Sequence, residues 1–247
     1  MTHMNRNNLQ YARTPDTSRG FTLIEVAVVL FIVTILLGSI LIPLTTQVEQ
    51  RQISDTQKTL EEIREALIGF ALVNGYLPCP DTDNDGAENI NAGSGLCATI
   101  AGGIAAGRLP HANLGLGNAD LWGNRFSYVI NENFTRRSPA TPFALTVAGT
   151  DVRICTAQSC ATTLSTTAVF AVISHGRNGL GAVNFLTNAA NPAAAGADEQ
   201  ENSDTDRNIV SHPPFSGGAA ASEFDDVVIW MSRYTLFNRM VAAGKLP

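Results

Sequence analysis

One acidic residue lies near the start of a long apolar segment. Glu25 is the single formal charge within residues 21–44, a stretch long enough to cross a hydrocarbon core as a helix of about 20 residues. A carboxylate in such a segment is costly, so it is normally paired with a cation and serves a function. The alternative is a simple single-pass anchor whose acid lies at headgroup level. The sequence therefore predicts that Glu25 has a cationic partner.

A second acidic group, Asp81, Asp83 and Asp85 followed by Gly86, has the alternation that opens an EF-hand calcium loop. The match ends there, because the twelfth position is Ala92 instead of a bidentate glutamate. Calcium at this loop is the weaker of two calcium hypotheses. The alternative is a solvated turn rich in Asx residues.

Four cysteines follow the apolar segment, and they allow three pairings. Proximity in the sequence favours Cys79 with Cys97 and Cys155 with Cys160, in an oxidising compartment. Zinc is disfavoured, because the spacings contain no Cys-x-x-Cys knuckle and the histidines are scattered. The sequence predicts two short disulfide-closed loops.

A nucleophile and base are suggested by Ser174 beside His175, but neighbouring residues on a strand point to opposite faces. The chain also lacks a Gly-x-Ser-x-Gly elbow, a zinc-binding helix motif and a phosphate loop. We therefore predict no enzymatic activity. The net charge of −6, without a cluster of Lys and Arg, also predicts that the chain does not bind nucleic acid.

The N-terminal elements must position Glu25. Residues 1–20 contain three Arg and one Asp, which predicts a cytoplasmic N-terminus and export of the rest of the chain. In residues 45–74 apolar residues recur at intervals of three, four, five or seven with charged residues between them, as an amphipathic helix requires. One helix is expected from Phe21 to about Val73, ending at Asn74-Gly75. Pro43 predicts either a gentle kink or local loss of helix on assembly.

The segment Arg19-Gly20-Phe21-Thr22-Leu23-Ile24-Glu25-Val26 resembles the processing site of type IV pilins and type II secretion pseudopilins. The resemblance implies cleavage after Gly20 by a prepilin peptidase and N-methylation of the new Phe21 amine. It also implies that the Glu25 carboxylate pairs with the Phe21 amine of a neighbouring subunit. Such a pair fixes axial register, since a misplaced subunit leaves a charge unpaired in an apolar environment.

The second half of the chain contains short runs rich in β-branched and aromatic residues, bounded by turn residues. These runs predict antiparallel strands at residues 125–131, 143–148, 152–155, 168–174 and 227–231. Residues 76–118 show no clear period and are expected to form a long, disulfide-tied connection. Ser232 is expected to cap a short C-terminal helix that ends before Gly244. The fold class is α+β, with a long helix packed on an antiparallel sheet.

Three further segments are similar to the major pseudopilin: residues 120–128, residues 173–179 and residues 225–230. The resemblance implies a calcium-stabilised loop after residues 173–179, because calcium takes six to eight oxygen ligands from carboxylates and carbonyls. The acids available to it are Asp198, Asp204, Asp206, Asp225 and Asp226. Residues 184–203 are a long insertion relative to that family, and the alternative is a mobile acidic loop.

These observations predict a leader at residues 1–20, a membrane or filament-core half-helix at 21–44, an amphipathic half-helix at 45–74 and an exported pilin-like domain at 75–247. The predicted function is a structural subunit of a type II secretion pseudopilus or a type IV pilus. The alternative is a minor pilin that acts as an adhesin or binding module. The implied partners are other pilin subunits, the prepilin peptidase and an assembly platform in the bacterial inner membrane. The subunit would lie in that membrane with its globular domain in the periplasm, and in a periplasmic or extracellular filament once assembled.

Overall fold

The computed structural model describes residues 20–98, 102–137, 149–215 and 223–246, and only the backbone of residues 39–46. Residues 1–19 of the predicted leader and the strand predicted at 143–148 lie outside the described residues. The chain divides into two compact units between Val48 and Glu49. Each unit is described by itself.

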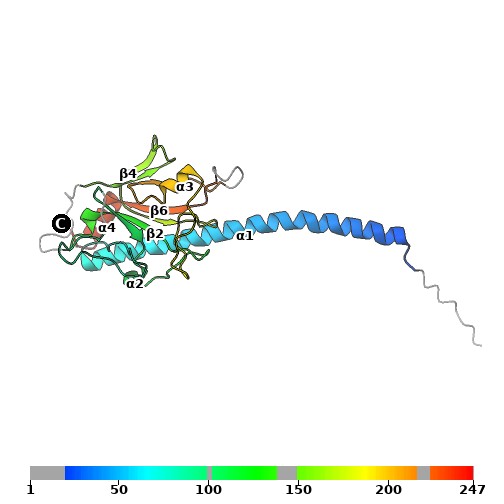
Figure 1. The fold of residues 1–247 in the computed structure, drawn as a ribbon, viewed down its shortest axis with the longest axis horizontal. Helices are drawn as coiled ribbons and strands as arrows, with labels where there is room; N and C mark the ends of the chain where they lie inside the picture. The colour runs from blue at the N-terminus through cyan, green and yellow to red at the C-terminus, as the bar shows by residue number, and fades with distance from the viewer. Residues whose placement is uncertain (1–19, 99–101, 138–148, 216–222, 247) are drawn as a thin grey trace, which may run out of the picture. The chain divides into compact units, whose positions relative to one another are not determined.

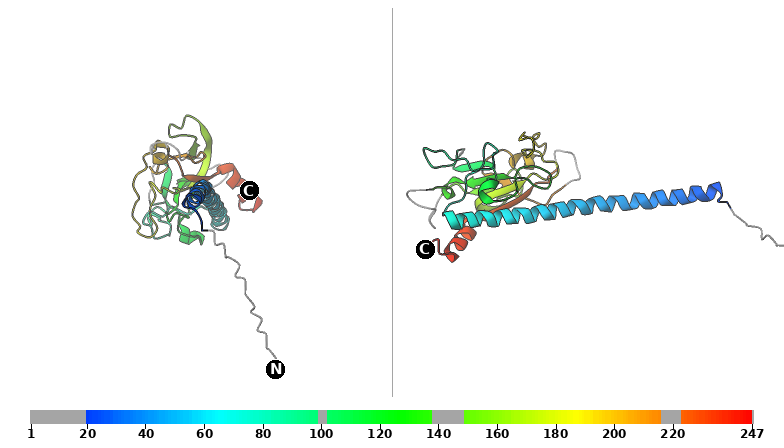
Figure 2. Two further views of the ribbon diagram at one scale, coloured as in Figure 1. Left: turned by 90° about the vertical axis from the view of Figure 1, so that its right-hand side faces the viewer. Right: turned by 90° about the horizontal axis from the view of Figure 1, so that it is seen from below.

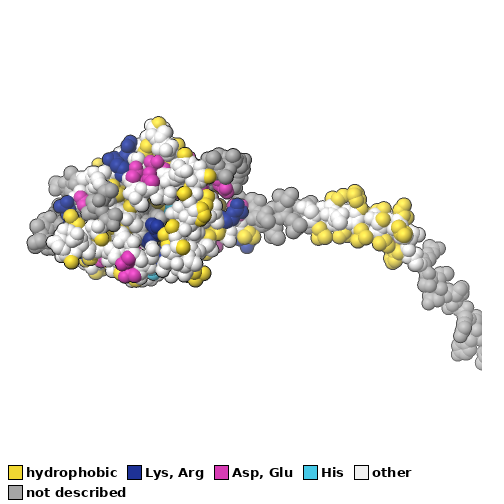
Figure 3. Space-filling model, viewed as in Figure 1, with side chains coloured by type: hydrophobic (Ala, Val, Ile, Leu, Met, Phe, Trp, Pro, Cys, Tyr) yellow, Lys and Arg dark blue, Asp and Glu magenta, His cyan; other side chains and the backbone are white. Residues whose placement is uncertain are grey.

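The first unit contains the N-terminal part of helix α1 (Leu23–Asn74). From Leu23 to Leu37 its large apolar side chains are exposed in the single chain, and Figure 3 shows them on the face turned to the viewer. The backbone stays helical through Gly38 and Pro43, so loss of helix on assembly stays a prediction. No helix in the part of the chain that the structure describes is both long and apolar enough to cross a membrane.

In the second unit, the C-terminal part of α1 packs one side into the core. Leu60, Ile63 and Leu67 are fully buried at the three- and four-residue spacing of a helix face. Charged residues such as Asp55 and Lys58, which form an ion pair 2.7 Å long, occupy the exposed side. The helix ends where Gly75 adopts a positive φ of 79°. The helix therefore ends at Asn74, as expected, with an apolar side in the core and a charged side exposed.

Within the described residues, six strands form one sheet: β1 (Ile104–Arg108), β2 (Ser127–Asn131), β3 (Val152–Cys155), β4 (Thr163–Ser174), β5 (Asn208–Val210) and β6 (Val227–Ser232). Their order is β1-β2-β4-β3-β5, and β6 pairs with the end of β4 beyond β3. The pairs are antiparallel except for β3 with β5, which is parallel. The sheet is therefore mixed, and it differs from the predicted antiparallel sheet in this one pair.

The predicted strands at 125–131, 152–155, 168–174 and 227–231 correspond to β2, β3, the second half of β4, and β6. The prediction missed β1 and β5. The region 76–118, expected to be irregular, contains β1 and the short helix α2 (His111–Leu114). A 3₁₀ turn at Glu132–Phe134 follows β2, and helix α3 (Ala197–Glu201) lies within the predicted insertion.

Alternate residues of the sheet enter two cores. Tyr128, Ile130 and Ile229 belong to the core that contains the buried face of α1, which we call the α1-side core. Val129 and Ile173 join a second core on the other face. This alternation is the two-residue period of a β-strand. The fold is α+β, as predicted.

Helix α4 (Arg233–Ala242) follows β6 directly. The Ser232 hydroxyl accepts the Thr235 N–H at 3.2 Å, which is the predicted cap. Arg239 reaches Glu65 of α1 at 3.4 Å. Figures 1 and 2 show α4 beside the last turns of α1, so its apolar side extends the α1-side core.

Candidate functional site

Two side chains cap the first turn of α1. Glu25 N–H donates to the Thr22 hydroxyl at 3.3 Å, and Thr22 N–H donates to Glu25 Oε2 at 3.5 Å. This reciprocal arrangement is a capping box, in which each side chain satisfies a backbone N–H that the helix leaves free. Glu25 also places negative charge at the positive end of the helix dipole.

Gly20 and Phe21 precede this cap and are exposed, with 81% of Phe21 accessible. Glu25 is exposed too, and it is surrounded along the helix by exposed apolar side chains. The start of α1 therefore presents one carboxylate on an otherwise apolar surface. A cation from another molecule could reach the Glu25 carboxylate there.

Both predicted disulfides form, Cys79–Cys97 and Cys155–Cys160. Cys79 and Cys97 are buried in the α1-side core, so their bond fastens the loop before β1 to the centre of the domain. Cys155 ends β3, and Cys160 lies in the turn before β4. No cysteine in the chain is free.

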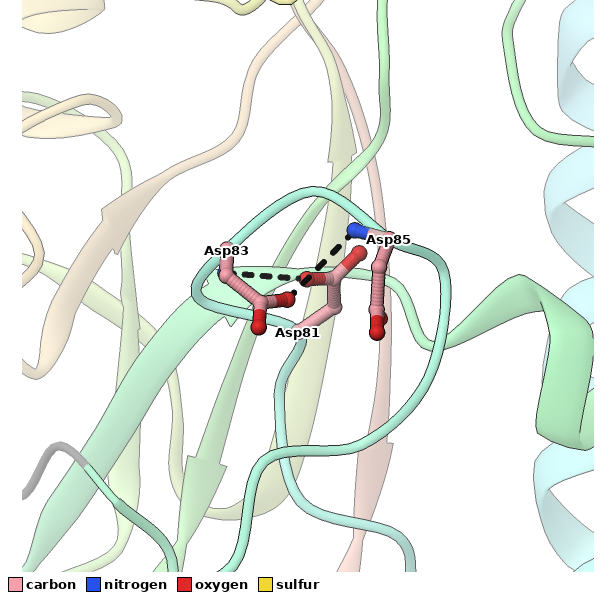
Figure 4. A group of neighbouring side chains, drawn as sticks. All are labelled: Asp81, Asp83 and Asp85. Atoms are coloured by element: carbon pink, nitrogen blue, oxygen red, sulfur yellow. Dashed lines mark hydrogen bonds between the residues drawn. The ribbon is translucent and has the colours of Figure 1, made fainter.

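The loop after Cys79 is held by Asp81 (Figure 4). Asp81 is fully buried, and its Oδ1 accepts the N–H groups of Asp83 and Asn84 at 3.1 and 2.7 Å. Its Oδ2 accepts the Gly86 N–H at 2.8 Å. Burial raises the pKa of Asp81, although the three N–H groups oppose this effect. Asp81, Asp83 and Asp85 are close enough to share an ion, but the buried carboxylate already has protein partners, as expected of an Asx-rich turn.

The five acids predicted to bind calcium near the end of the chain do not form one group. Asp198 accepts the Gln158 N–H at 2.7 Å and lies 3.2 Å from His212 Nε2. Asp204 and Asp206 are exposed and group with Glu201. Asp225 and Asp226 remain together, and the residue that joins them is Glu199.

Glu199, Asp225 and Asp226 place three carboxylates so close that one oxygen from each lies within 4.8 Å of the others. Glu199 and Asp226 are almost completely buried, at 1% and 2% exposure. Among the described residues no Lys or Arg pairs with these acids, and His175 Nδ1 lies 3.6 Å from Asp226 Oδ1. Burial raises the pKa of Glu199, and it raises that of Asp225 to about 7. Burial therefore favours the protonated form of these two carboxyls, and a cation nearby would favour the ionised form.

Each of these carboxylates has one satisfied oxygen and one unsatisfied oxygen. Glu199 Oε1 accepts from Asn178 Nδ2 at 3.0 Å and from the Asp225 N–H at 3.1 Å. Asp225 Oδ2 accepts the Asn178 N–H, and Asp226 Oδ2 accepts from Asn202 Nδ2, both at 2.8 Å. The remaining oxygens, Glu199 Oε2, Asp225 Oδ1 and Asp226 Oδ1, are buried without a hydrogen bond. Three such oxygens suit a hard divalent cation of the calcium type.

The turn after β4 brings this group together. Gly176 has a φ of 57°, and a Cβ there would clash with the main-chain oxygen and the carboxylate of Asp225. His175 is fully buried and its Nε2 lies 2.8 Å from the Ser127 hydroxyl. Ser174 instead donates to Asp120 Oδ2 at 2.7 Å. The two adjacent residues that suggested a nucleophile and base therefore point to different partners.

A comparison with known protein families finds one match, to the prokaryotic N-terminal methylation motif, over residues 16–41. The chain carries a pilin-type N-terminus. This motif is the signature of type IV pilins and pseudopilins, and it includes Gly20, Phe21 and Glu25. Comparisons with curated proteins and with solved structures find no match.

Outside the pilin-type N-terminus, the contacts of Glu199 and Asn202 with the acids before β6 were not predicted from the sequence. Both lie in the insertion at residues 184–203, where acids and amides are frequent and no local pattern separates a ligand from a solvated side chain. Asp198 and Glu199 are adjacent in α3, and adjacent residues of a helix face different neighbours. A helix predicted at these residues would have shown that only one of the two faces the other acids. Glu199, and not the predicted Asp198, groups with Asp225 and Asp226 before β6.

Proposed function

We propose that this chain is a structural subunit of a type II secretion pseudopilus or a type IV pilus. The observation that carries the proposal is Glu25, which caps the first turn of an exposed apolar helix directly after Gly20-Phe21, inside the matched methylation motif. A motif of this kind marks proteins whose N-terminal helices assemble. The function is therefore assembly.

The proposed mechanism combines apolar burial with one ion pair. Neighbouring helices would cover the exposed side chains between Leu23 and Leu37, and close packing of these apolar side chains would hold the helices together. Cleavage after Gly20 would free the Phe21 amine, which is cationic. Pairing of that amine with Glu25 of a neighbour would set the register, since an unpaired charge in an apolar contact is costly.

The partners follow from this mechanism. They are other pilin-type subunits, a prepilin peptidase that cleaves after Gly20, and an inner-membrane platform that assembles the filament. Before assembly the subunit would be anchored in the bacterial inner membrane through its N-terminus, with residues 75–247 in the periplasm. Genes for secretion beside this one would favour a pseudopilus, whereas genes for adhesion or DNA uptake would favour a pilus or a minor pilin.

Mass spectrometry of the protein from its host tests the proposal. The expected mature chain begins with N-methylated Phe21. An intact Met1, or cleavage at a site other than the Gly20–Phe21 bond, would refute the pilin assignment.

We also propose calcium as a structural ligand of the globular part. The support is the set of buried carboxylate oxygens without partners on Glu199, Asp225 and Asp226. A bound calcium ion would neutralise these carboxylates and would supply no reactive chemistry. Of the five acids predicted from the sequence to bind calcium, we retain Asp225 and Asp226 in this proposal. Asp198, Asp204 and Asp206 lie beside other residues.

A further inference from the structure

β6 lies at an edge of the sheet. Ile173 of β4 pairs with Ser127 of β2 and also with Val228 of β6, so these two strands flank β4 on opposite sides. Alternate residues of an antiparallel strand direct their N–H and C=O groups away from the strand with which they pair. Among the described residues, none forms a hydrogen bond to the backbone of residues 227–231 from that outer side. The outer edge of β6 therefore offers backbone donors and acceptors to a further strand.

Two other edges of the sheet are closed within the protein. At the end of β1, the Asp81 N–H donates to the Arg108 carbonyl at 2.9 Å, and the Arg108 N–H donates to the Asp81 carbonyl at 2.7 Å. At β5, the Asn202 side chain accepts the Val210 N–H at 2.7 Å and donates to the Val210 carbonyl at 3.0 Å. Proteins usually protect strand edges, because an open edge pairs readily with another chain. The unprotected edge of β6 therefore points to a partner that covers it.

A groove follows this open edge. It consists of three adjoining hollows of about 460, 520 and 540 Å³, and Val228 lines all three. Residues 228–232 line the first hollow without a gap. Because side chains alternate between the two faces of a strand, consecutive residues line one hollow where it runs along the edge. We call these three hollows the β6 groove.

Helix α1 forms one wall of the β6 groove, beside β6 (Figure 1). The wall residues recur at intervals of three and four, as one side of a helix requires: Ser54, Gln57, Lys58, Glu61, Arg64 and Glu65. At the end of β6, Arg239 of α4 lies 3.4 Å from Glu65, and both residues line the groove. Near the start of β6, Leu164, Pro213 and Pro214 give it an apolar lining. The open edge is therefore recessed between walls.

These walls determine which occupant fits. A second copy of this chain would bring its own β6 with α1 beside it, so two recessed edges would meet wall to wall. A single extended segment has no such walls and can enter the groove along its length. Added to β6, it would form the main-chain hydrogen bonds that supply affinity in strand addition, while contacts with its alternate side chains would supply specificity.

We propose that the β6 groove binds an extended peptide segment of another protein by strand addition. Side chains of this segment near the start of β6 would be apolar, because Leu164, Pro213 and Pro214 line that end. Side chains near the end of β6 would be polar or charged, because Glu61 and Arg64 line the groove there. The proposal concerns the globular unit alone, so it does not depend on the filament or calcium proposals.

Selection of a phage-displayed library of random twelve-residue peptides on the full-length chain in detergent tests this proposal. The selected peptides are expected to slow hydrogen exchange of the backbone amides in residues 227–232, measured by mass spectrometry. Exchange in β1, whose edge is met by Asp81, should not change. Failure to select any peptide, or protection elsewhere without protection of residues 227–232, would overturn the proposal.

Two N-methylated versions of a selected peptide separate strand addition from side-chain contact alone. One is methylated at its odd positions and the other at its even positions, so each loses the N–H donors of one edge. Because a strand pairs through one edge, one version is expected to bind about tenfold or more weakly, measured by fluorescence polarisation, while the other binds like the unmodified peptide. Equal affinity of the two versions would refute main-chain pairing.

Gln57→Trp is the decisive variant, and Glu62→Trp is its matched control on α1. Gln57 is exposed and lines two of the hollows, so an indole at this position would occupy the groove. Glu62 is also exposed but lines none of the three. Gln57→Trp is expected to abolish detectable peptide binding, whereas Glu62→Trp should bind like the wild type. Both should keep the wild-type unfolding temperature, and equal peptide binding by the two variants would contradict the site.

A second copy in the β6 groove would give a different result. The chain would then form a dimer whose population rises with concentration, seen by analytical ultracentrifugation, and Gln57→Trp but not Glu62→Trp would dissociate it. That result would overturn the choice of a peptide as the occupant. None of these outcomes affects the processing of Phe21, so the filament proposal is tested separately.

Discussion

Thr22 and Glu25 cap the first turn of α1 by exchanging hydrogen bonds, from the Glu25 N–H to the Thr22 hydroxyl and from the Thr22 N–H to the Glu25 carboxylate. Glu25 thus has a role within its own chain as well as the proposed role between chains. The carboxylate engages Thr22 through Oε2. The intrachain role needs only an acceptor, whereas the proposed ion pair needs a charge.

Glu25→Gln separates these two roles. Glutamine can replace glutamate in a capping box, so the start of the helix should be retained while the charge is lost. We expect Glu25→Gln to be processed at Gly20 and to assemble as poorly as Glu25→Ala, measured as filament protein sheared from cells. Thr22→Ser, which keeps both the cap and the charge, is the control and should assemble normally. Normal filaments from Glu25→Gln would show that the charge is dispensable.

Asp81 should support the loop after Cys79 far more than its acidic neighbours do. Asp81→Ala removes the acceptor of three backbone N–H groups, of which that of Gly86 is buried, at a cost of about 1–3 kcal/mol. Asp81→Asn keeps an acceptor and should cost less. Asp85→Ala removes an exposed side chain and is the control, with a change of about 0.5 kcal/mol or less. Urea unfolding measures all three, and equal losses for Asp81→Ala and Asp85→Ala would contradict this role.

The sequence predicted β2, β3, the second half of β4, and β6, because each has β-branched or aromatic residues between turn residues. It did not predict β1, whose residues Ile104–Arg108 include two alanines and a glycine. β1 is extended because it pairs along its length with β2 and because Gly107 allows the Asp81 backbone and the Pro80 side chain to approach. β5 spans only Asn208–Val210 and depends on its parallel pairing with β3. In both strands tertiary pairing decides the conformation, which a local pattern does not contain.

The same limit applies to the candidate sites. Glu25 was identified from the sequence because the apolar run around it is local. Asp225 and Asp226 were among the five acids that the resemblance to the major pseudopilin offered as calcium ligands. Their partner Glu199 depends on how α3 is brought back to the sheet, through Asn178 and Asn202. Local sequence specifies neither that path nor the resulting contact.

Asp120 should make stability depend on pH. Burial raises its pKa above the ordinary value of 3.8, against the opposing hydrogen bonds from the Asn124 N–H and the Ser174 hydroxyl. A group whose pKa is raised on folding stabilises the fold fully below its unfolded pKa, and that contribution is lost as the pH rises through the folded pKa. Asp120→Asn should therefore become more stable relative to the wild type as the pH rises from about 4 towards 7.

Urea unfolding of both proteins at several pH values measures this difference. Asp55→Asn, which removes one negative charge from the exposed side of α1, controls for the change in net charge. A stability difference between Asp120→Asn and wild type that is independent of pH, or that falls as the pH rises, would contradict the burial argument.

Gly176 should be required both for the turn after β4 and for the position of Asp225. Gly176 and Gly115 both have positive φ angles, of 57° and 68°, so alanine at either is strained by about 1–2 kcal/mol. The two positions differ in the space available to a side chain. A Cβ at Gly115 meets nothing within 4 Å, whereas a Cβ at Gly176 clashes with Asp225. Gly176→Ala should therefore cost about 1–3 kcal/mol more than Gly115→Ala in urea unfolding. It should also weaken calcium binding, because the clash displaces a proposed ligand, while Gly115→Ala should bind calcium like the wild type. Equal destabilisation by the two substitutions would show that the turn, and not the approach to Asp225, makes glycine necessary at position 176.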